Sequence, residues 1–158
     1  MAHEPPAASL LPDCEELMAR QRDIYQTYRK SGIAPAAKMF AEFIKAGQET
    51  AGLLRAFDPK NGQFIFANNM YWFERELPYY LAHPLDLSAL RSQQNKLLLL
   101  NGQDSNPEAM QYRPNVVLSE MFGVELHVVP GGHVGFALHA AKFGKVAYDL
   151  LKDKDSSY

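Results

Sequence analysis

Four consecutive leucines at residues 97–100 constrain the fold more than any other feature, because an unbroken apolar run is typical of a parallel strand buried on both faces. A second strand is expected over 124–129, where apolar and polar residues alternate as in a strand nearer the sheet edge. Between them, 107–122 has the apolar spacing of a helix that Gly123 ends and that Pro114 should kink or restart. Strand, helix, strand at this spacing is a βαβ unit, so the predicted fold class is α/β.

The preceding part of the chain has helical periodicity instead. Four helices are expected, over residues 13–31, 35–46, 49–57 and 64–81. The last of these is the densest apolar segment, and its large apolar side chains recur every three or four residues: Phe66, Met70, Phe73, Leu77 and Leu81. This spacing predicts a helix that lines a core or a pocket, and Tyr71, Trp72 and Tyr79 would suit an apolar pocket wall.

Composition excludes several classes of protein. A chain of 158 residues with 47% hydrophobic residues is large and apolar enough for one packed domain. Its net charge of -2, with basic residues scattered, gives no electrostatic case for binding nucleic acid or an anionic membrane. The first residues lack the pattern of a signal peptide, and no apolar run approaches the ~20 residues of a membrane helix. With Cys14 as the only cysteine, we expect a cytoplasmic protein without an internal disulfide.

His133 is the first candidate for catalysis. It follows the second predicted strand directly after Gly131 and Gly132, which allow a backbone path that carries the imidazole clear of the strand end. Sites in open parallel sheets lie beyond the carboxyl ends of the strands. Histidine so placed can act as a general base, since its ordinary pKa is ~6.5. The other histidines are expected to be structural or surface groups: His3, His83, His127 and His139.

These segments together resemble the C-terminal portion of the α/β-hydrolase fold. Residues 112–114 and 130–136 are closely similar to the end of one hydrolase subgroup, and the Gly-Gly-His-Val-Gly-Phe run at 131–136 is the most specific part. The resemblance implies a truncated α/β-hydrolase-like fold. In it, residues 1–9 follow the sixth strand, 10–92 form a helical cap, and 93–158 form a β-α-β-α part with two parallel strands.

The resemblance leaves two carboxylates as the partner of His133. Hydrolases commonly place an acid after the seventh strand, in the pattern glycine, two residues, Asp. Counted from Gly102, that position is Ser105, so Asp104 is one residue out of register. Some hydrolases place the acid after the sixth strand instead, and the segment around Glu4 looks like that place. Both Asp104 and Glu4 therefore remain candidates.

The family's nucleophile is not found in the chain. It stands in a Gly-x-Ser-x-Gly elbow upstream of the acid and the histidine, and no serine here has those flanking glycines. The strands that would flank the leucine run are also absent. Exposing that run would cost about 1.5–3 kcal/mol per leucine, so we expect a homo-oligomer or a partner chain to cover the sheet edge, unless the helices rearrange to cover it.

Three functions remain open at this point. In the first, a hydrolase-derived enzyme uses His133 with Glu4 or Asp104 as an acid/base pair for cyclisation, isomerisation or elimination of a hydrophobic small molecule, such as a natural-product intermediate. In the second, the chain is the C-terminal portion of a serine-triad ester or amide hydrolase whose nucleophile is supplied elsewhere. In the third, it is a noncatalytic binding or assembly protein. The sequence implies no metal and no cofactor, because no ligand spacing and no phosphate-binding fingerprint occurs.

Overall fold

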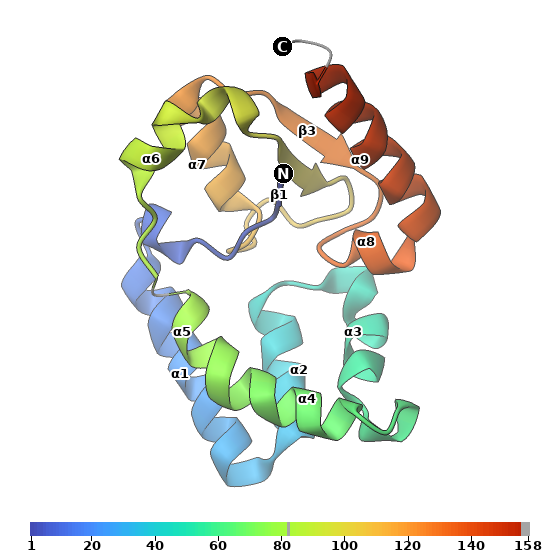
Figure 1. Ribbon diagram of the computed structural model, residues 1–158. Helices are drawn as coiled ribbons and strands as arrows, with labels where there is room; N and C mark the ends of the chain where they lie inside the picture. The colour runs from blue at the N-terminus through green and yellow to red at the C-terminus, as the bar shows by residue number, and fades with distance from the viewer. Residues whose placement is uncertain (82, 156–158) are drawn as a thin grey trace. The chain divides into compact units, whose positions relative to one another are not determined.

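The computed structural model describes residues 1–81 and 83–155, and these form two compact units (Figure 1). Met1–Pro5 belong with the chain from Asp86 onward, and we call this the sheet unit. Pro6–Leu85 form the second, which we call the helical unit. The described chain is mostly helical with a small parallel sheet, in keeping with the predicted α/β class. None of the helices in the described part is long and apolar enough to cross a membrane.

The sheet contains three parallel strands in the order β1-β2-β3: β1 (Ala2–His3), β2 (Leu99–Gly102) and β3 (Leu126–Val129). In the register, Ala2 pairs with Leu99, and Leu100 pairs with His127. The two parallel strands predicted for 93–158 are present as β2 and β3, and β1 is a third strand that the sequence pattern does not predict. A strand of two residues is too short to show any period, so β1 becomes recognisable only through its pairing with β2.

Three of the four leucines of the run are buried within the chain itself. Leu98, Leu99 and Leu100 are at most 4% exposed, as expected for a central strand. The strand begins two residues later than predicted and includes Asn101 and Gly102, which are also buried. Because β1 lies on one side of β2 and β3 on the other, β2 pairs on both of its edges within the described chain. β3 is the edge strand that its alternation predicts, and Val128 on it is exposed.

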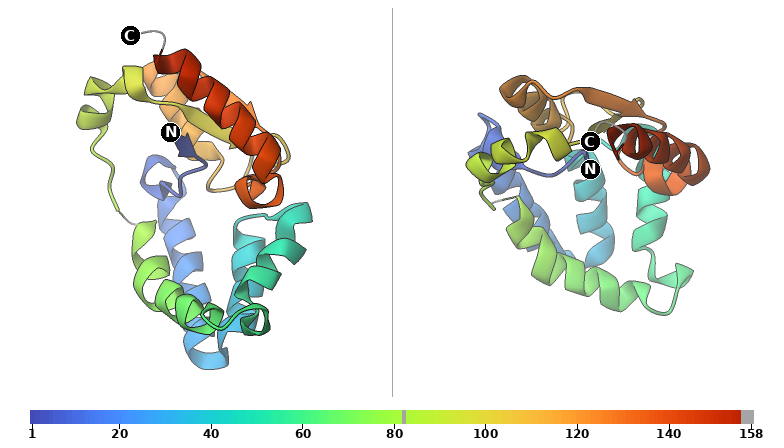
Figure 2. Two further views of the ribbon diagram at one scale, coloured as in Figure 1. Left: turned by 45° about the vertical axis from the view of Figure 1, so that its right-hand side comes forward. Right: turned by 45° about the horizontal axis from the view of Figure 1, so that its top comes forward.

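Helices cover both faces of the sheet. α7 (Arg113–Phe122) lies on one face and α9 (Ala140–Asp155) on the other, while α6 (Leu87–Ser92) precedes β2 and α8 (Gly135–Leu138) precedes α9 (Figure 2). Pro114 sits in the first turn of α7, so the helix predicted from 107 begins at Arg113 instead. Proline fits there because the first helical N–H groups have no partner inside the helix. Gly123 ends α7 in the left-handed conformation, as predicted.

The helical unit follows the local signals of its sequence closely. It contains α1 (Cys14–Ser31), α2 (Ile33–Phe43) and α3 (Thr50–Phe57). Gly32 separates α1 from α2 with a φ of 84°, a conformation that favours glycine. Asp58 and Pro59 end α3, and the Asp58 side chain accepts a hydrogen bond from the Lys60 N–H.

The aromatic segment is helical as predicted, but it is not one continuous α-helix. α4 (Ile65–Tyr71) is followed by a π-helical turn (Trp72–Glu76) and then by α5 (Leu77–Tyr80). Pro78 lacks an N–H and cannot continue the α-helical ladder, which accounts for the wider turn just before it. Phe73, Leu77 and Leu81 are fully buried, whereas Phe66 and Met70 are exposed. The single apolar stripe of the sequence is thus divided into a buried half and an exposed half.

Candidate functional site: a buried glutamate and a histidine at the sheet end

Glu4 lies directly after β1, at the carboxyl end of the sheet. Its backbone N–H donates to the Leu100 carbonyl at 3.1 Å, which continues the pairing of β1 with β2. Its φ is 42°, in the left-handed region that non-glycine residues rarely occupy. Such a conformation costs about 1–3 kcal/mol, and strain of this kind gathers at functional sites. The strained backbone turns a carboxylate, 1% exposed, in toward the end of β2.

Both oxygens of the Glu4 carboxylate have partners. Oε1 accepts a hydrogen bond from the Gly102 N–H at 2.9 Å, and Oε2 lies 3.1 Å from His133 Nδ1. Burial alone would raise the pKa of Glu4, but hydrogen bonds from His133, Ser105 and the Gly102 N–H bring this pKa below its ordinary value of 4.5. The carboxylate is therefore ionised at neutral pH.

The loop that carries His133 packs tightly on the end of β2. A Cβ built on Gly102 would lie 2.5 Å from the Gly131 carbonyl oxygen, so this approach requires glycine. The Asp104 N–H donates to the same oxygen at 3.1 Å. Gly131 has a φ of 85°, which confirms that the glycine turn takes a path closed to most residues. These contacts fix the loop after β3 beside the loop after β2, and so place His133 above Glu4.

His133 is oriented by Glu4 and remains accessible. Because an ionised carboxylate only accepts hydrogen bonds, Nδ1 carries the proton and Nε2 is the acceptor. The His133 side chain is 27% exposed while that of Glu4 is 0% exposed, so the imidazole can meet a ligand and the carboxylate cannot. His3 lies in the same site, with its ring stacked on that of His133 at 6.3 Å between centroids. The Phe143 ring meets His3 edge-on at 5.0 Å.

Of the two candidate acids, the structure places Glu4 against His133 and leaves Asp104 apart. The Asp104 side chain is exposed and makes no hydrogen bond or ion pair within the described residues. Ser105, at the position where the family pattern puts an acid, instead supports Glu4. The count from Gly102 reaches this position but predicts no role for a serine there. The contributions of the Gly102 N–H and of His3 have no comparable signal in the sequence.

The buried side-chain amide of Asn115 links the ends of β1 and β2. Asn115 of α7 is 0% exposed, and its Nδ2 donates to the carbonyls of Ala2 and Leu100 at 3.0 and 2.9 Å. The same nitrogen lies 3.1 Å from Asn101 Oδ1. One side chain thus links β1, β2 and α7 within a few residues of Glu4. We infer that it stabilises the strand pairing on which the position of Glu4 depends.

The arrangement is suited to proton transfer. A histidine whose tautomer is set by a buried carboxylate can take a proton at Nε2 and return it. Within the described residues, no group of three or more His, Cys, Asp or Glu side chains is placed to share a metal ion. No protein-family model matches the sequence.

Proposed function

We propose that this chain is an α/β-hydrolase-like enzyme of small-molecule metabolism in which His133 transfers protons and Glu4 orients it. The observation that carries the proposal is the 3.1 Å contact between His133 Nδ1 and Glu4 Oε2 beyond the carboxyl ends of parallel strands. The lowered pKa of Glu4, caused by its hydrogen bonds, keeps a negative charge beside the imidazole. That charge favours the imidazolium that forms when Nε2 accepts a proton.

In the first form of the proposal, His133 acts without a nucleophile. It removes a proton from a hydrophobic organic substrate and returns it at a second position, as cyclisation, isomerisation and elimination require. This form needs only the groups that the described residues supply. It is supported by the accessible imidazole and by the full set of hydrogen bonds around Glu4.

In the second form, the pair belongs to a serine triad that hydrolyses esters or amides, with the serine supplied from outside residues 1–158. A carboxylate on Nδ1 with Nε2 left open is the arrangement that such a triad uses. A second observation favours it. β1 is the end strand of the sheet in the described part of the chain, and an end strand is the position at which a further strand can add to a sheet. A partner chain or a further segment seated there would extend the sheet.

The elimination of 5-nitrobenzisoxazole tests the shared feature, a positioned base. The base removes the ring C–H proton while the N–O bond breaks, and the coloured phenolate is followed directly. We expect His133→Ala to lower the rate by about 10²–10⁴-fold. His127→Ala is the matched control. His127 lies on β3, its side chain is 21% exposed, and its Nδ1 is 3.6 Å from the carboxylate of Glu125. Equal rates for these two variants would contradict the role of His133 as the base.

A fluorophosphonate probe separates the two forms. Applied to the native protein, it reacts with an activated serine. The triad form predicts covalent labelling that His133→Ala abolishes, with the label on a peptide outside residues 1–158. The first form predicts base activity with no label on any peptide.

A further inference from the structure

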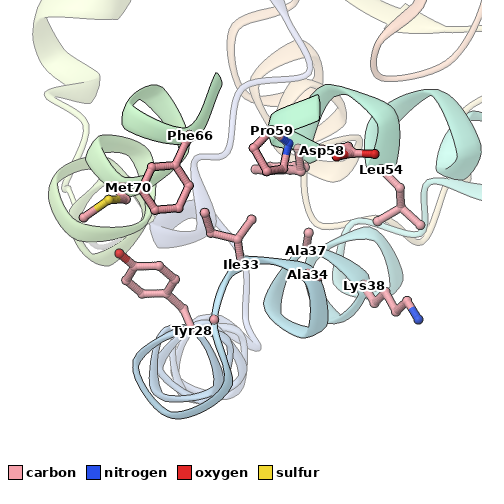
Figure 3. A pocket seen from close by; sticks show the side chains of 12 residues that line it. Tyr28, Ile33, Ala34, Ala37, Lys38, Leu54, Asp58, Pro59, Phe66 and Met70 are labelled. Atoms are coloured by element: carbon pink, nitrogen blue, oxygen red, sulfur yellow. The ribbon is translucent and has the colours of Figure 1, made fainter. Parts of the chain in front are cut away.

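The helical unit contains a cavity of about 580 Å³ (Figure 3). Its wall comes from residues 28–70, in α1 to α4 and their connections, and no described residue of the sheet unit contributes. Cavities of about 300–1,000 Å³ with mostly apolar walls are typical binding sites for small organic molecules. The size and composition of this cavity are those of a ligand site rather than of a packing defect.

Small residues keep the cavity open. Gly32 ends α1, and Ala34 and Ala37 follow at the start of α2, so three positions on this side of the cavity carry little side-chain volume, with Ile33 as the large residue among them. Phe66 and Met70 of α4 lie across from them, and Figure 3 shows Phe66 close to Ile33. A larger residue at 34 would fill part of the space. These small residues therefore contribute to the opening.

The far wall exposes apolar surface that a ligand would cover. Phe66 is 54% exposed and Met70 is 40% exposed, although both belong to the most apolar segment of the chain. Removing apolar surface from water is worth about 25 cal/mol per Å². Exposed apolar residues gathered at a concave surface mark a binding site more often than scattered ones do.

The charged side chains of the wall do not give the cavity a net charge that a ligand would have to match. Lys38 and Asp58 have opposite signs, and Figure 3 shows the Lys38 ammonium directed away from the centre. The Asp58 carboxylate already accepts the Lys60 N–H at 3.0 Å. The Tyr28 hydroxyl donates to Glu74 at 3.0 Å, and burial together with Glu74 raises the pKa of Tyr28, so the phenol stays neutral.

We propose that this cavity binds an uncharged, apolar organic molecule, held through contacts of its rings and aliphatic carbons with Phe66, Met70 and Ile33. The proposal goes beyond the chemistry of His133 and Glu4, because the whole wall lies in the helical unit. It requires neither proton transfer nor a nucleophile. It can therefore hold or fail independently of the proposed function.

The test uses N-phenyl-1-naphthylamine, a neutral apolar fluorophore, titrated into the full chain. We expect saturable binding at one site. Ala34→Phe places a ring in the cavity and should weaken binding by about tenfold or more, which corresponds to about 1.4 kcal/mol. Ala51→Phe is the matched control, because Ala51 is an exposed residue of α3 that is not part of the wall. It should leave the affinity unchanged.

A second pair of variants tests the apolar character of the site. Met70→Glu places a carboxylate in the wall and should abolish probe binding, whereas Met121→Glu changes a methionine of similar exposure, 39% against 40%, in the sheet unit and should not. His133→Ala should bind the probe as the wild type does. Circular dichroism and thermal unfolding confirm that each variant is folded. Binding that does not saturate, or that Ala34→Phe and Ala51→Phe change equally, would overturn the proposal.

Discussion

The backbone N–H of Gly102 donates a 2.9 Å hydrogen bond to Glu4 Oε1, although 98 residues separate the two in the sequence. One oxygen of the carboxylate is thus fixed by β2 and the other faces His133. The position of the imidazole depends on the pairing of β1 with β2 as well as on its own loop.

Glu4→Gln should weaken His133 as a base. The variant keeps the shape of the side chain but loses a charge-assisted hydrogen bond, worth about 1.5–3 kcal/mol, or about 10–100-fold in the rate of 5-nitrobenzisoxazole elimination. The ¹⁵N chemical shifts of the His133 ring should also lose the signature of a fixed Nδ1–H tautomer. Asp104→Asn is the matched control and should change neither quantity. If Asp104→Asn produced the larger effect, Glu4 would not be the orienting acid.

The stability of the protein should depend on pH through Glu4. Hydrogen bonds to His133, Ser105 and Gly102 lower the pKa of Glu4 in the folded state below its ordinary value of 4.5. The stabilisation is therefore fully present well above about pH 4.5 and is lost as pH falls through the lower, folded-state pKa. Urea unfolding between pH 3 and 6 should show a steeper loss for the wild type than for Glu4→Gln. Parallel curves would contradict the ionised, hydrogen-bonded carboxylate.

Gly102→Ala should displace the His133 loop. The new Cβ would lie 2.5 and 2.7 Å from the carbonyl oxygens of Gly131 and Gly132, so the loop must move. We expect a loss of about 1–3 kcal/mol in the free energy of unfolding and a drop in base activity. Gly144→Ala is the control, because a Cβ on this residue of α9 meets no atom within 4 Å. It should stabilise the protein by about 0.5–1 kcal/mol, as alanine does within a helix.

Asn115→Ala should destabilise the sheet. It removes the amide that donates to Ala2 and Leu100 and leaves a cavity at a fully buried position, which together cost about 2–4 kcal/mol. Asn95→Ala, at an exposed position, should stay within about 0.5 kcal/mol of the wild type. Urea unfolding measures both variants. Equal stabilities would mean that Asn115 contributes no net cross-linking of the strands.

The sequence predicts the elements whose ends are marked by local chemistry. Gly32, the Asp58-Pro59 pair and Gly123 end their helices where expected, because each acts on the backbone next to it. The register of β2 is not predicted, since a run of leucines looks the same from either face of a sheet. β1 is missed because two residues have no pattern of their own, and only the distant β2 makes them a strand.

In the candidate site, too, the features set by neighbouring residues are predicted and those set by distant residues are not. The glycine turn identifies His133 because its consequence is local. The choice between Glu4 and Asp104 is not decided by the sequence, since it depends on contacts that join residue 4 to residues 102 and 133. Ser105 is found by counting from Gly102, but its support of Glu4 appears only when β1 is in place.

The π-helical turn at Trp72–Glu76 changes the direction in which the apolar side chains before and after it face. One additional residue in a helical turn rotates the preceding side chains by about 100°. Met70 lies before the turn and Leu77 after it, and in an unbroken α-helix the two would share one stripe, yet here Met70 borders the cavity and Leu77 lies in the core. This phase offset lets one apolar repeat serve two surfaces. A deletion of one residue there would bring Met70 and Leu77 into phase and change cavity and core together.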